Sequence, residues 1–598
     1  MYITMGIPSY FSHFVREHRQ IIKSIQNASI PIDNLYLDCN GFIYDAVNSD
    51  RTNKNEDLLI KFVCDKLIYY INLLKPSQRV FIAFDGVAPV AKLNQQRKRR
   101  YLSWYQAKMM RDYETVSAGK PVAKDATWNT AAITPGTPFM AKLATAIKAR
   151  FANPAEFGLV QLKISCADEP GEGEHKLFEY IRAYADYHKD THTVIYGLDA
   201  DLIMLTLNHL PICNHLYLFR ETPEFIKSID NTLNPNELYV LDIPALGQRI
   251  IADFTLAGAG GAGTNASGAG TNASGPNASG AFTTTGYDKI HDYIFLFFLL
   301  GNDFLPHFPA LNIRTQGINL LVNAYKHVLN AKGLLLTTNG RIVWKHFRLL
   351  IDYLQKNEFT YLQQEYALRN KQSISLQKRV ITHETPRKAF EYNIQNLPMT
   401  DRATEQYINP REVGWENRYY QCLFGGEMQK NEAQQNEAQQ NEAQQNEAQK
   451  NETQKNEVQK NETQKNEVQK KEICLNYLAG LEWTYKYYRT GCIDWQWTYK
   501  TDYPPLLADL IKYIPYFETE FLSPKPAKPV RDIVQLSYVL PKQSLDLLPS
   551  KTKTLLLKKK PEWYVDDCEF QWAFCKYFWE AHVKLPKIDI VELEKILI

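Results

Sequence analysis

The sequence lacks the patterns that mark secreted, zinc-binding and membrane-spanning proteins. Its 9 cysteines are scattered, with no CxxC pair and no Cys/His cluster at zinc-ligand spacing, which is typical of reduced thiols inside a cell. The N-terminus has no charged-then-apolar signal region, and no apolar run reaches the ~18 residues that a membrane span needs. We therefore expect an intracellular protein, cytoplasmic or nuclear, that makes no contact with a membrane.

A strong charge of one sign is also missing. The formal net charge is +3 over 598 residues, so the overall composition does not select a polyanionic partner, and only local charge patterns can do so. Aromatic residues are plentiful, with 36 Tyr and 10 Trp. Such residues either fill cores or provide surfaces on which bases stack. The length suits about two to four domains, each with its own core.

Two low-complexity segments interrupt the chain. Residues 257–280 contain only small and polar residues, which predicts a flexible surface loop. Residues 431–470 repeat a pentapeptide of the NEAQQ type. Because a period of five does not match the helical repeat, no continuous apolar face forms. This segment is predicted to be a solvated helix or a disordered spacer.

Two pairs of carboxylates lie close together in the sequence between residues 168 and 207. Glu172 and Glu174 follow a glycine-containing loop at the start of a predicted helix, and Asp199 and Asp201 follow the apolar strand 193–196. Four carboxylates brought together repel one another, and a pair of hard divalent cations such as Mg²⁺ relieves that repulsion. The alternative is that these are solvated acids on a helix and a loop.

Three further acids stand at comparable positions. Asp38 follows the predicted strand 34–37, Asp85 follows the strand 79–84, and Asp303 comes soon after the wholly apolar segment 293–300. Acids at the ends of buried strands are where α/β folds place ligand-binding groups. The alternation of strands and helices predicts a mostly parallel sheet with helices on both faces.

A basic segment begins at residue 91, directly after the strand that ends in Asp85. If it is helical, Lys92, Gln96, Arg99 and Arg100 share one face, at spacings i, i+4, i+7 and i+8. Three cations and an amide on one face suit a phosphate group, for which arginine offers forked donors. The alternative is a solvated basic helix or a localisation-type patch.

Taken together and in this order, these motifs closely resemble the Xrn family of 5′→3′ exoribonucleases. The resemblance covers most of the chain outside the two low-complexity segments. The motifs that carry it are MGIP at Met5, LDCNG around Asp38, FDGVAPVAKLNQQRKRRY from Phe84, ITPGTPFM from Ile133, PGEGEHKLFEYIR from Pro170, YGLDADLIML from Tyr196, GNDFLPHFPAL from Gly301, GLEWTYKYYRTGCIDWQWTYKTDYPP from Gly480 and EWYVDD near Trp563.

The resemblance implies an α/β fold. It consists of a PIN-like nuclease domain with a mostly parallel central sheet flanked by helices, plus a largely helical second region packed around the active site. We expect the catalytic region to span residues 1–356, including the insert 257–280. The second region is then split into 357–430 and 471–598 by the spacer 431–470. A compact member of the family is expected, without the long C-terminal extension or the zinc knuckle of some relatives.

The resemblance also implies a function. It is processive hydrolysis of 5′-monophosphorylated single-stranded RNA to 5′-mononucleotides, in RNA decay or processing, by a monomer with two Mg²⁺ ions for which Mn²⁺ can substitute. By the resemblance, the catalytic and metal-binding residues are Asp38, Asp85, Glu172, Glu174, Asp199, Asp201 and Asp303, and the 5′-phosphate-binding residues are Lys92, Gln96, Arg99 and Arg100. Tyr44, where the family usually has histidine, and Trp495 or Trp497 are expected to stack on bases.

Two other functions are considered. A structure-specific flap-type DNA nuclease uses a similar acid cluster, but the region after its last acid carries a glycine-rich helix-hairpin-helix clamp. Here that region reads PHFPALNIRTQGINLL. A catalytically inactive RNA-binding homologue is expected to have lost some of the acids, and here all seven are present.

Overall fold

A computed structural model describes ten stretches of the chain. They are residues 19–25, 30–49, 55–118, 128–220, 233–234, 237–255, 284–378, 385–425, 448–525 and 528–598. The motif at Met5, the insert 257–280 and the first part of the pentapeptide repeat all lie outside these described residues.

A seven-stranded sheet forms the centre of the N-terminal half, in the order β1-β7-β6-β5-β2-β3-β4. The pairs among β4, β3, β2, β5 and β6 are parallel, whereas β7 pairs antiparallel with β6 and with the edge strand β1. The prediction of a mostly parallel sheet is therefore confirmed. The strands are β1 (Ile22–Ser24), β2 (Asn34–Asp38), β3 (Arg79–Ala83), β4 (Gln161–Ser165), β5 (His192–Tyr196), β6 (His215–Arg220) and β7 (Tyr239–Asp242).

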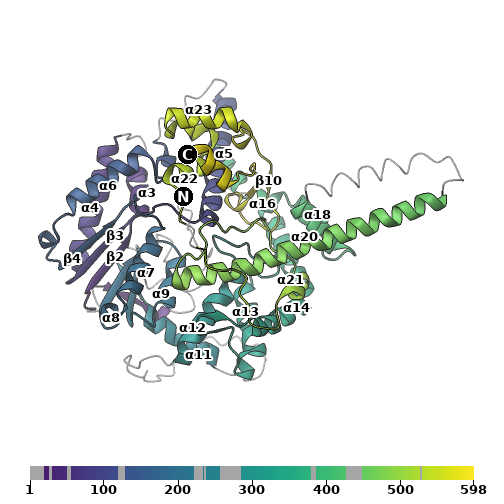
Figure 1. Cartoon of the computed structure of the whole chain (residues 1–598), viewed down its shortest axis with the longest axis horizontal. Helices are drawn as coiled ribbons and strands as arrows, with labels where there is room; N and C mark the ends of the chain where they lie inside the picture. Colours follow the sequence, from purple (N-terminus) through teal and green to yellow (C-terminus); the bar gives the residue numbers. More distant parts are fainter. Residues whose placement is uncertain are drawn as a thin grey trace.

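Both faces of this sheet are covered, as the apolar character of its strands requires. In β2, Leu35 and Leu37 pack into one core cluster, and Tyr36 between them packs into the other. Helices α3, α4 and α6 cover the first face, and α7, α9, α11 and α12 cover the second (Figure 1). The helices of this half are α3 (Asn40–Ser49), α4 (Glu56–Leu74), α5 (Val90–Ala118), α6 (Pro138–Arg150), α7 (Gly173–Ala183), α8 (Ala185–His188), α9 (Asp201–Asn208), α11 (Ile243–Thr255), α12 (Thr284–Phe297) and α13 (Gly317–Val328).

The second half is largely helical, as expected, with only two short two-stranded ribbons in its described part, β8–β9 (Thr337–Thr338 and Arg341–Ile342) and β10–β11 (Phe570–Gln571 and His582–Val583). Helix α14 runs unbroken through residue 356. The helices are α14 (Trp344–Lys378), α15 (Pro386–Gln395), α16 (Leu397–Thr400), α17 (Ala403–Ile408), α18 (Trp415–Phe424), α20 (Ala448–Thr490), α21 (Leu507–Tyr513), α22 (Asp532–Val539), α23 (Ser550–Lys559) and α24 (Ile590–Leu597).

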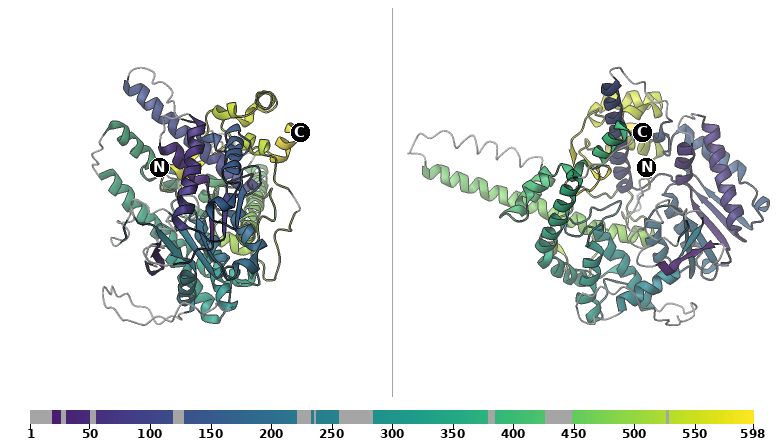
Figure 2. Two further views of the ribbon diagram at one scale, coloured as in Figure 1. Left: turned by 90° about the vertical axis from the view of Figure 1, so that its left-hand side faces the viewer. Right: turned by 180° about the vertical axis from the view of Figure 1, so that it is seen from behind.

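Helix α20 joins the repeat to the core of the molecule. Its N-terminal part contains the last pentapeptides and extends away from the body, whereas its C-terminal part enters the centre (Figures 1 and 2). There Trp483 and Tyr487 are buried. The described pentapeptides are thus helical; a helix was one of the two predicted forms, the other being a disordered spacer.

The long helix α5 is held in place by the C-terminal part of the chain. It packs against α22 and α15. The buried Arg97 guanidinium donates to the carbonyl oxygens of Pro586 at 2.7 Å and Trp563 at 3.2 Å. Because these contacts link residues more than 400 positions apart, the two halves of the chain pack together around α5. Within the described residues, no helix is long and apolar enough to cross a membrane.

Candidate active site

Six of the seven predicted acids come from one edge of the sheet. Asp38 is the last residue of β2 and Asp85 lies just beyond β3, while the pair at 172 and 174 begins α7, and the pair at 199 and 201 begins α9 after β5. The carboxyl ends of neighbouring parallel strands meet at the same edge of a sheet. The strand order β5-β2-β3-β4 therefore brings these side chains together.

Lys92 lies in the middle of this cluster. Its ammonium nitrogen Nζ is 2.6 Å from Oε2 of Glu172 and 2.6 Å from Oδ2 of Asp303, the seventh acid. The other oxygen of Asp303 accepts a hydrogen bond from Nε2 of Gln95 at 2.5 Å. Asp303 follows the buried helix α12 and the short turn after it, so it approaches from outside the sheet. Six of the seven acids thus interact electrostatically with Lys92, and Asp85 interacts with three of those six.

The cluster contains seven acids, and Lys92 forms ion pairs with two of them. Burial, together with repulsion from neighbouring carboxylates, raises the pKa of Asp38 and Glu174 well above their ordinary values. Burial likewise raises the pKa of Asp199 to about 6 and that of Asp201 to about 8. Asp303 is different: burial raises its pKa, but the charge and hydrogen bond of Lys92 lower it overall. Such a cluster favours the binding of further positive charge.

The donor set fits a hard divalent cation. Oδ1 of Asp38 and Oε2 of Glu174 are buried and accept no hydrogen bond from the described residues, and carboxylate oxygens are the ligands that Mg²⁺ prefers. No three Asp, Glu, His or Cys side chains in the described part of the chain surround a single point at metal-ligand spacing. Lys92 occupies the space between Glu172 and Asp303, so a cation and Lys92 would compete for these two acids.

Asn40 orients one of the acids, a role that sequence reasoning missed. Its Nδ2 donates to Oδ2 of Asp85 at 2.5 Å, and its Oδ1 accepts from the Asp85 backbone N–H at 3.1 Å. The other oxygen of Asp85 accepts from the backbone N–H of Gly173 at 2.6 Å. The Asp-Cys-Asn-Gly sequence contained the signal, but it is equally typical of a turn.

Gly173 is required at its position by its distance from Asp38. A Cβ atom at residue 173 would lie 2.5 Å from Oδ1 of Asp38 and 3.4 Å from the carbonyl oxygen of Ala83. The first of these distances is well inside van der Waals contact. The absence of a side chain therefore lets the start of α7 approach the end of β2.

The aromatic-rich segment of α20 reaches the cluster through Tyr487. Its hydroxyl donates to Oε1 of Glu172 at 2.8 Å, so both oxygens of Glu172 have partners. The Tyr487 ring is stacked on His175 at a centroid distance of 3.7 Å and on Trp483 at 4.7 Å. No local pattern could have revealed this contact, because the two partners are 315 positions apart.

The predicted base-stacking residues differ in accessibility. Trp497 is buried and stacked on Trp483 at 5.1 Å. Trp495 is half-buried, and its carbonyl oxygen accepts from the backbone N–H of Val90 at the start of α5. Tyr44 on α3 is exposed over 40% of its surface. Of the two tryptophans, Trp495 is therefore the more accessible.

The basic face of α5 divides into three environments. Lys92 pairs with the acids, whereas Oε1 of Gln96 and Nη1 of Arg100 are buried without a partner among the described residues. Nη2 of Arg100 makes a long contact of 3.4 Å to the carbonyl oxygen of Ile133, and burial lowers the pKa of this guanidinium to about 10. Arg99 lies between the acids and a cavity lined in part by Asp303. Unpartnered polar atoms on the helix whose Lys92 pairs with the acids favour a binding site for a polar ligand.

Comparisons with known proteins identify two family regions. Residues 5–222 match the model of the XRN 5′-3′ exonuclease N-terminus, and residues 287–597 match the model of the Xrn1 helical domain. The chain is 26% identical over 676 residues to 5′-3′ exoribonuclease 1 of Saccharomyces cerevisiae, covering 98% of this chain and 42% of the yeast protein.

Two further relatives are also 5′-3′ exoribonucleases that match nearly the whole chain. The chain is 27% identical to 5′-3′ exoribonuclease 2 of Gallus gallus over 98% of its own length and 69% of the chicken protein. It is 27% identical to the human 5′-3′ exoribonuclease 1, covering 98% of this chain but 33% of the human protein. The chain thus spans less than half of the yeast and human relatives. With two family models matched in order along most of its length, the chain belongs to the Xrn family of 5′-3′ exonucleases.

Proposed function

We propose that this chain is a processive 5′→3′ exoribonuclease that hydrolyses 5′-monophosphorylated single-stranded RNA to 5′-mononucleotides. The observation that supports this most strongly is that one helix, α5, carries both Lys92, which pairs with two acids of the cluster, and the unpartnered polar atoms of Gln96 and Arg100. A terminal phosphate bound there brings the first phosphodiester of the strand to the carboxylates. Because a single chain carries all of these residues, we also propose that it acts as a monomer.

Each group has a distinct part in the proposed reaction. Asp38, Glu174, Asp199 and Asp201, with the other three acids, would hold two Mg²⁺ ions. Two Mg²⁺ ions, when bound, activate a water molecule and stabilise the leaving 3′ oxygen. Asn40 and the Gly173 N–H keep Asp85 in place, and Tyr487 does the same for Glu172.

The basic face of α5 would select the end of the RNA. Gln96, Arg99 and Arg100 bind the 5′-monophosphate, with Lys92 placed between that phosphate and the acids. A pocket for one terminal phosphate rejects a triphosphate or capped end by size and by unpaired charge. Tyr44 and Trp495 are positioned on accessible surface, and we propose that they stack on the first bases.

The proposed function is tested with RNA that differs only at its 5′ end. With Mg²⁺ present, 5′-monophosphorylated RNA should be degraded to 5′-mononucleotides, and the same RNA with a 5′-triphosphate should be degraded at least about 100-fold more slowly, since end selection depends on charge-matched contacts. Equal digestion of both substrates, or no digestion with Mg²⁺, contradicts the proposal.

Replacing Gly173 with alanine should impair catalysis more than folding. The added methyl would displace Asp38, and misplacing a reacting group by about 1 Å can cost on the order of 100-fold in rate. Overpacking of this kind typically costs about 1–3 kcal/mol of stability. Single-turnover cleavage and a thermal melt separate the two effects. Gly41→Ala is the matched control, because a Cβ there meets only Leu198 Cδ1, at 3.5 Å; equal activities of the two variants would refute the explanation.

Replacing Tyr487 with phenylalanine should lower the cleavage rate about tenfold and leave the fold intact. The change removes a hydrogen bond to a buried carboxylate, a class of bond that contributes about 1.5–3 kcal/mol. Tyr477→Phe on the same helix is the control, since its hydroxyl donates to the Pro306 carbonyl oxygen at 3.2 Å, away from the acids. The rate is measured at saturating RNA; a rate for Tyr487→Phe no lower than that of the control argues against a positioning role.

A further inference from the structure

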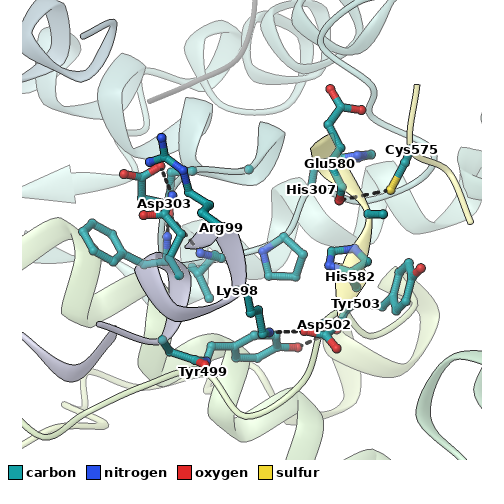
Figure 3. Close-up of a pocket in the computed structure, with 18 of the residues that line it drawn as sticks. Lys98, Arg99, Asp303, His307, Tyr499, Asp502, Tyr503, Cys575, Glu580 and His582 are labelled. Carbon is teal, nitrogen blue, oxygen red and sulfur yellow. Dashed lines mark hydrogen bonds and ion pairs between the residues drawn. The ribbon is translucent and has the colours of Figure 1, made fainter. Parts of the chain in front are cut away.

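A cavity lies next to the acid cluster and is not used by the proposed reaction. Its volume is about 310 Å³, and Asp303 lines it (Figure 3), together with Gln95 and the exposed Ser103. Because the first two residues also contact each other within the cluster, the cavity connects the cluster with the surface. Its volume is at the small end of pockets that hold one small molecule, which suits a single nucleotide and not a strand.

The cavity and the proposed phosphate-binding residues occupy adjoining faces of α5. Asn94, Lys98 and Leu102 line the cavity, and their helical positions lie to one side of those of Gln96 and Arg100. Arg99 stands at the boundary and belongs to both faces. The cavity therefore adjoins the proposed phosphate-binding face along α5.

The charges of the cavity walls are nearly balanced. Lys98 forms an ion pair with Asp502 (Figure 3), and elsewhere in the lining Arg314 pairs with Glu580. A strand with many phosphates gains little from such walls, because its binding depends on unpaired cations. A mononucleotide carries a single phosphate group, so its binding depends less on the charges of the walls.

The remaining walls offer surfaces for a base. Phe304, Tyr499 and Trp579 line the cavity, and aromatic rings bind any base by stacking. His307 and His582 also line it, and burial lowers the pKa of both, to about 4 for His582. They are therefore neutral near pH 7 and add no charge. The walls combine loose binding of the base with weak attraction for phosphate, as a site that empties in every cycle requires.

We propose that this cavity is a product site, which holds the 5′-mononucleotide after cleavage and releases it to solvent while the shortened strand advances. This inference rests on the proposed function, because the cavity is assigned as the exit route for the product of the proposed reaction. The inference predicts that filling this cavity slows release of the mononucleotide but does not slow the first cleavage.

Filling the cavity from two different walls tests the proposal. The variants are Asn94→Trp on α5 and Thr498→Trp on the segment opposite, both half-buried lining residues outside the acid cluster. Cleavage of the first phosphodiester in end-labelled 5′-monophosphorylated RNA, measured after quenching with enzyme in excess, should stay within about 2-fold of the unaltered protein. Continued degradation should slow at least about tenfold, because product release then limits the rate. Asn94→Ala and Thr498→Ala are the controls and should degrade RNA at the unaltered rate.

The outcomes separate this inference from the proposed function. If the unaltered protein does not cleave the first nucleotide from the RNA, the proposed function fails and the inference fails with it. If the unaltered protein is active and a folded tryptophan variant degrades RNA at the unaltered rate, the inference alone is overturned. It is also overturned if first cleavage and continued degradation slow equally, which would assign the cavity to the entering strand. Thermal melts establish which tryptophan variants are folded, and the two walls supply independent tests.

Discussion

Replacing Asp199 with asparagine should reduce RNA cleavage by at least about 1,000-fold, the scale seen when a residue of a catalytic unit is removed. Asp199 is buried beside Asp303 and Lys92, and burial raises its pKa to about 6. Asparagine has nearly the same shape but no negative charge, so it weakens cation binding without leaving a hole. RNA affinity should change little, because the proposed contacts to the terminal phosphate remain. Single-turnover cleavage and equilibrium binding of the same RNA measure the two quantities.

The matched control for this variant is Asp186→Asn. Asp186 is an exposed acid on α8, within the same helix–strand unit but outside the cluster. Its replacement should leave both cleavage and binding unchanged. Unchanged turnover in Asp199→Asn, with both proteins folded, would refute the role assigned to Asp199.

Replacing Arg100 with alanine should remove the preference for a 5′-monophosphate. Its buried Nη1 has no partner among the described residues, and a guanidinium can bind a phosphate through two parallel hydrogen bonds. We expect kcat/KM on 5′-monophosphorylated RNA to fall about 100-fold, the loss typical of removing a charge-assisted contact. The same ratio on 5′-hydroxyl RNA should hardly change.

Lys108→Ala is the control for Arg100→Ala. It also removes one positive charge from α5, but Lys108 is 40% exposed and pairs with Asp567 at 3.6 Å. The control should keep the end preference. An equal fall on both RNA ends in Arg100→Ala would instead mean that Arg100 supports the fold, through its contact with the Ile133 carbonyl oxygen.

The arrangement of the acids was accessible from the sequence because it depends on local patterns. Strands such as 34–38 and 192–196 are apolar runs of strand length, and each delivers an acid at its carboxyl end. Once the sheet is parallel, these ends meet at one edge. Asp303 was found in the same way, from the end of a wholly apolar segment. For the same reason, the order of the motifs was enough to indicate the family.

The partners of these acids were not accessible, because they depend on contacts between distant residues. Helical periodicity placed Lys92 on a phosphate-binding face, whereas in the structure its ammonium pairs with Glu172 and Asp303. Within the same basic run, Arg97 donates to carbonyl oxygens near the C-terminus and Lys98 pairs with Asp502. Periodicity shows which residues share a face but not what that face contacts.

The most direct test of the account is a crystal structure with Mn²⁺ and a non-hydrolysable 5′-phosphorylated oligonucleotide. Manganese can be located by its anomalous scattering, which distinguishes it from water. The account predicts Mn²⁺ among the carboxylates of Asp38, Glu174, Asp199 and Asp201, and the terminal phosphate against Gln96 and Arg100. Manganese outside this cluster, or a terminal phosphate bound away from α5, would contradict it.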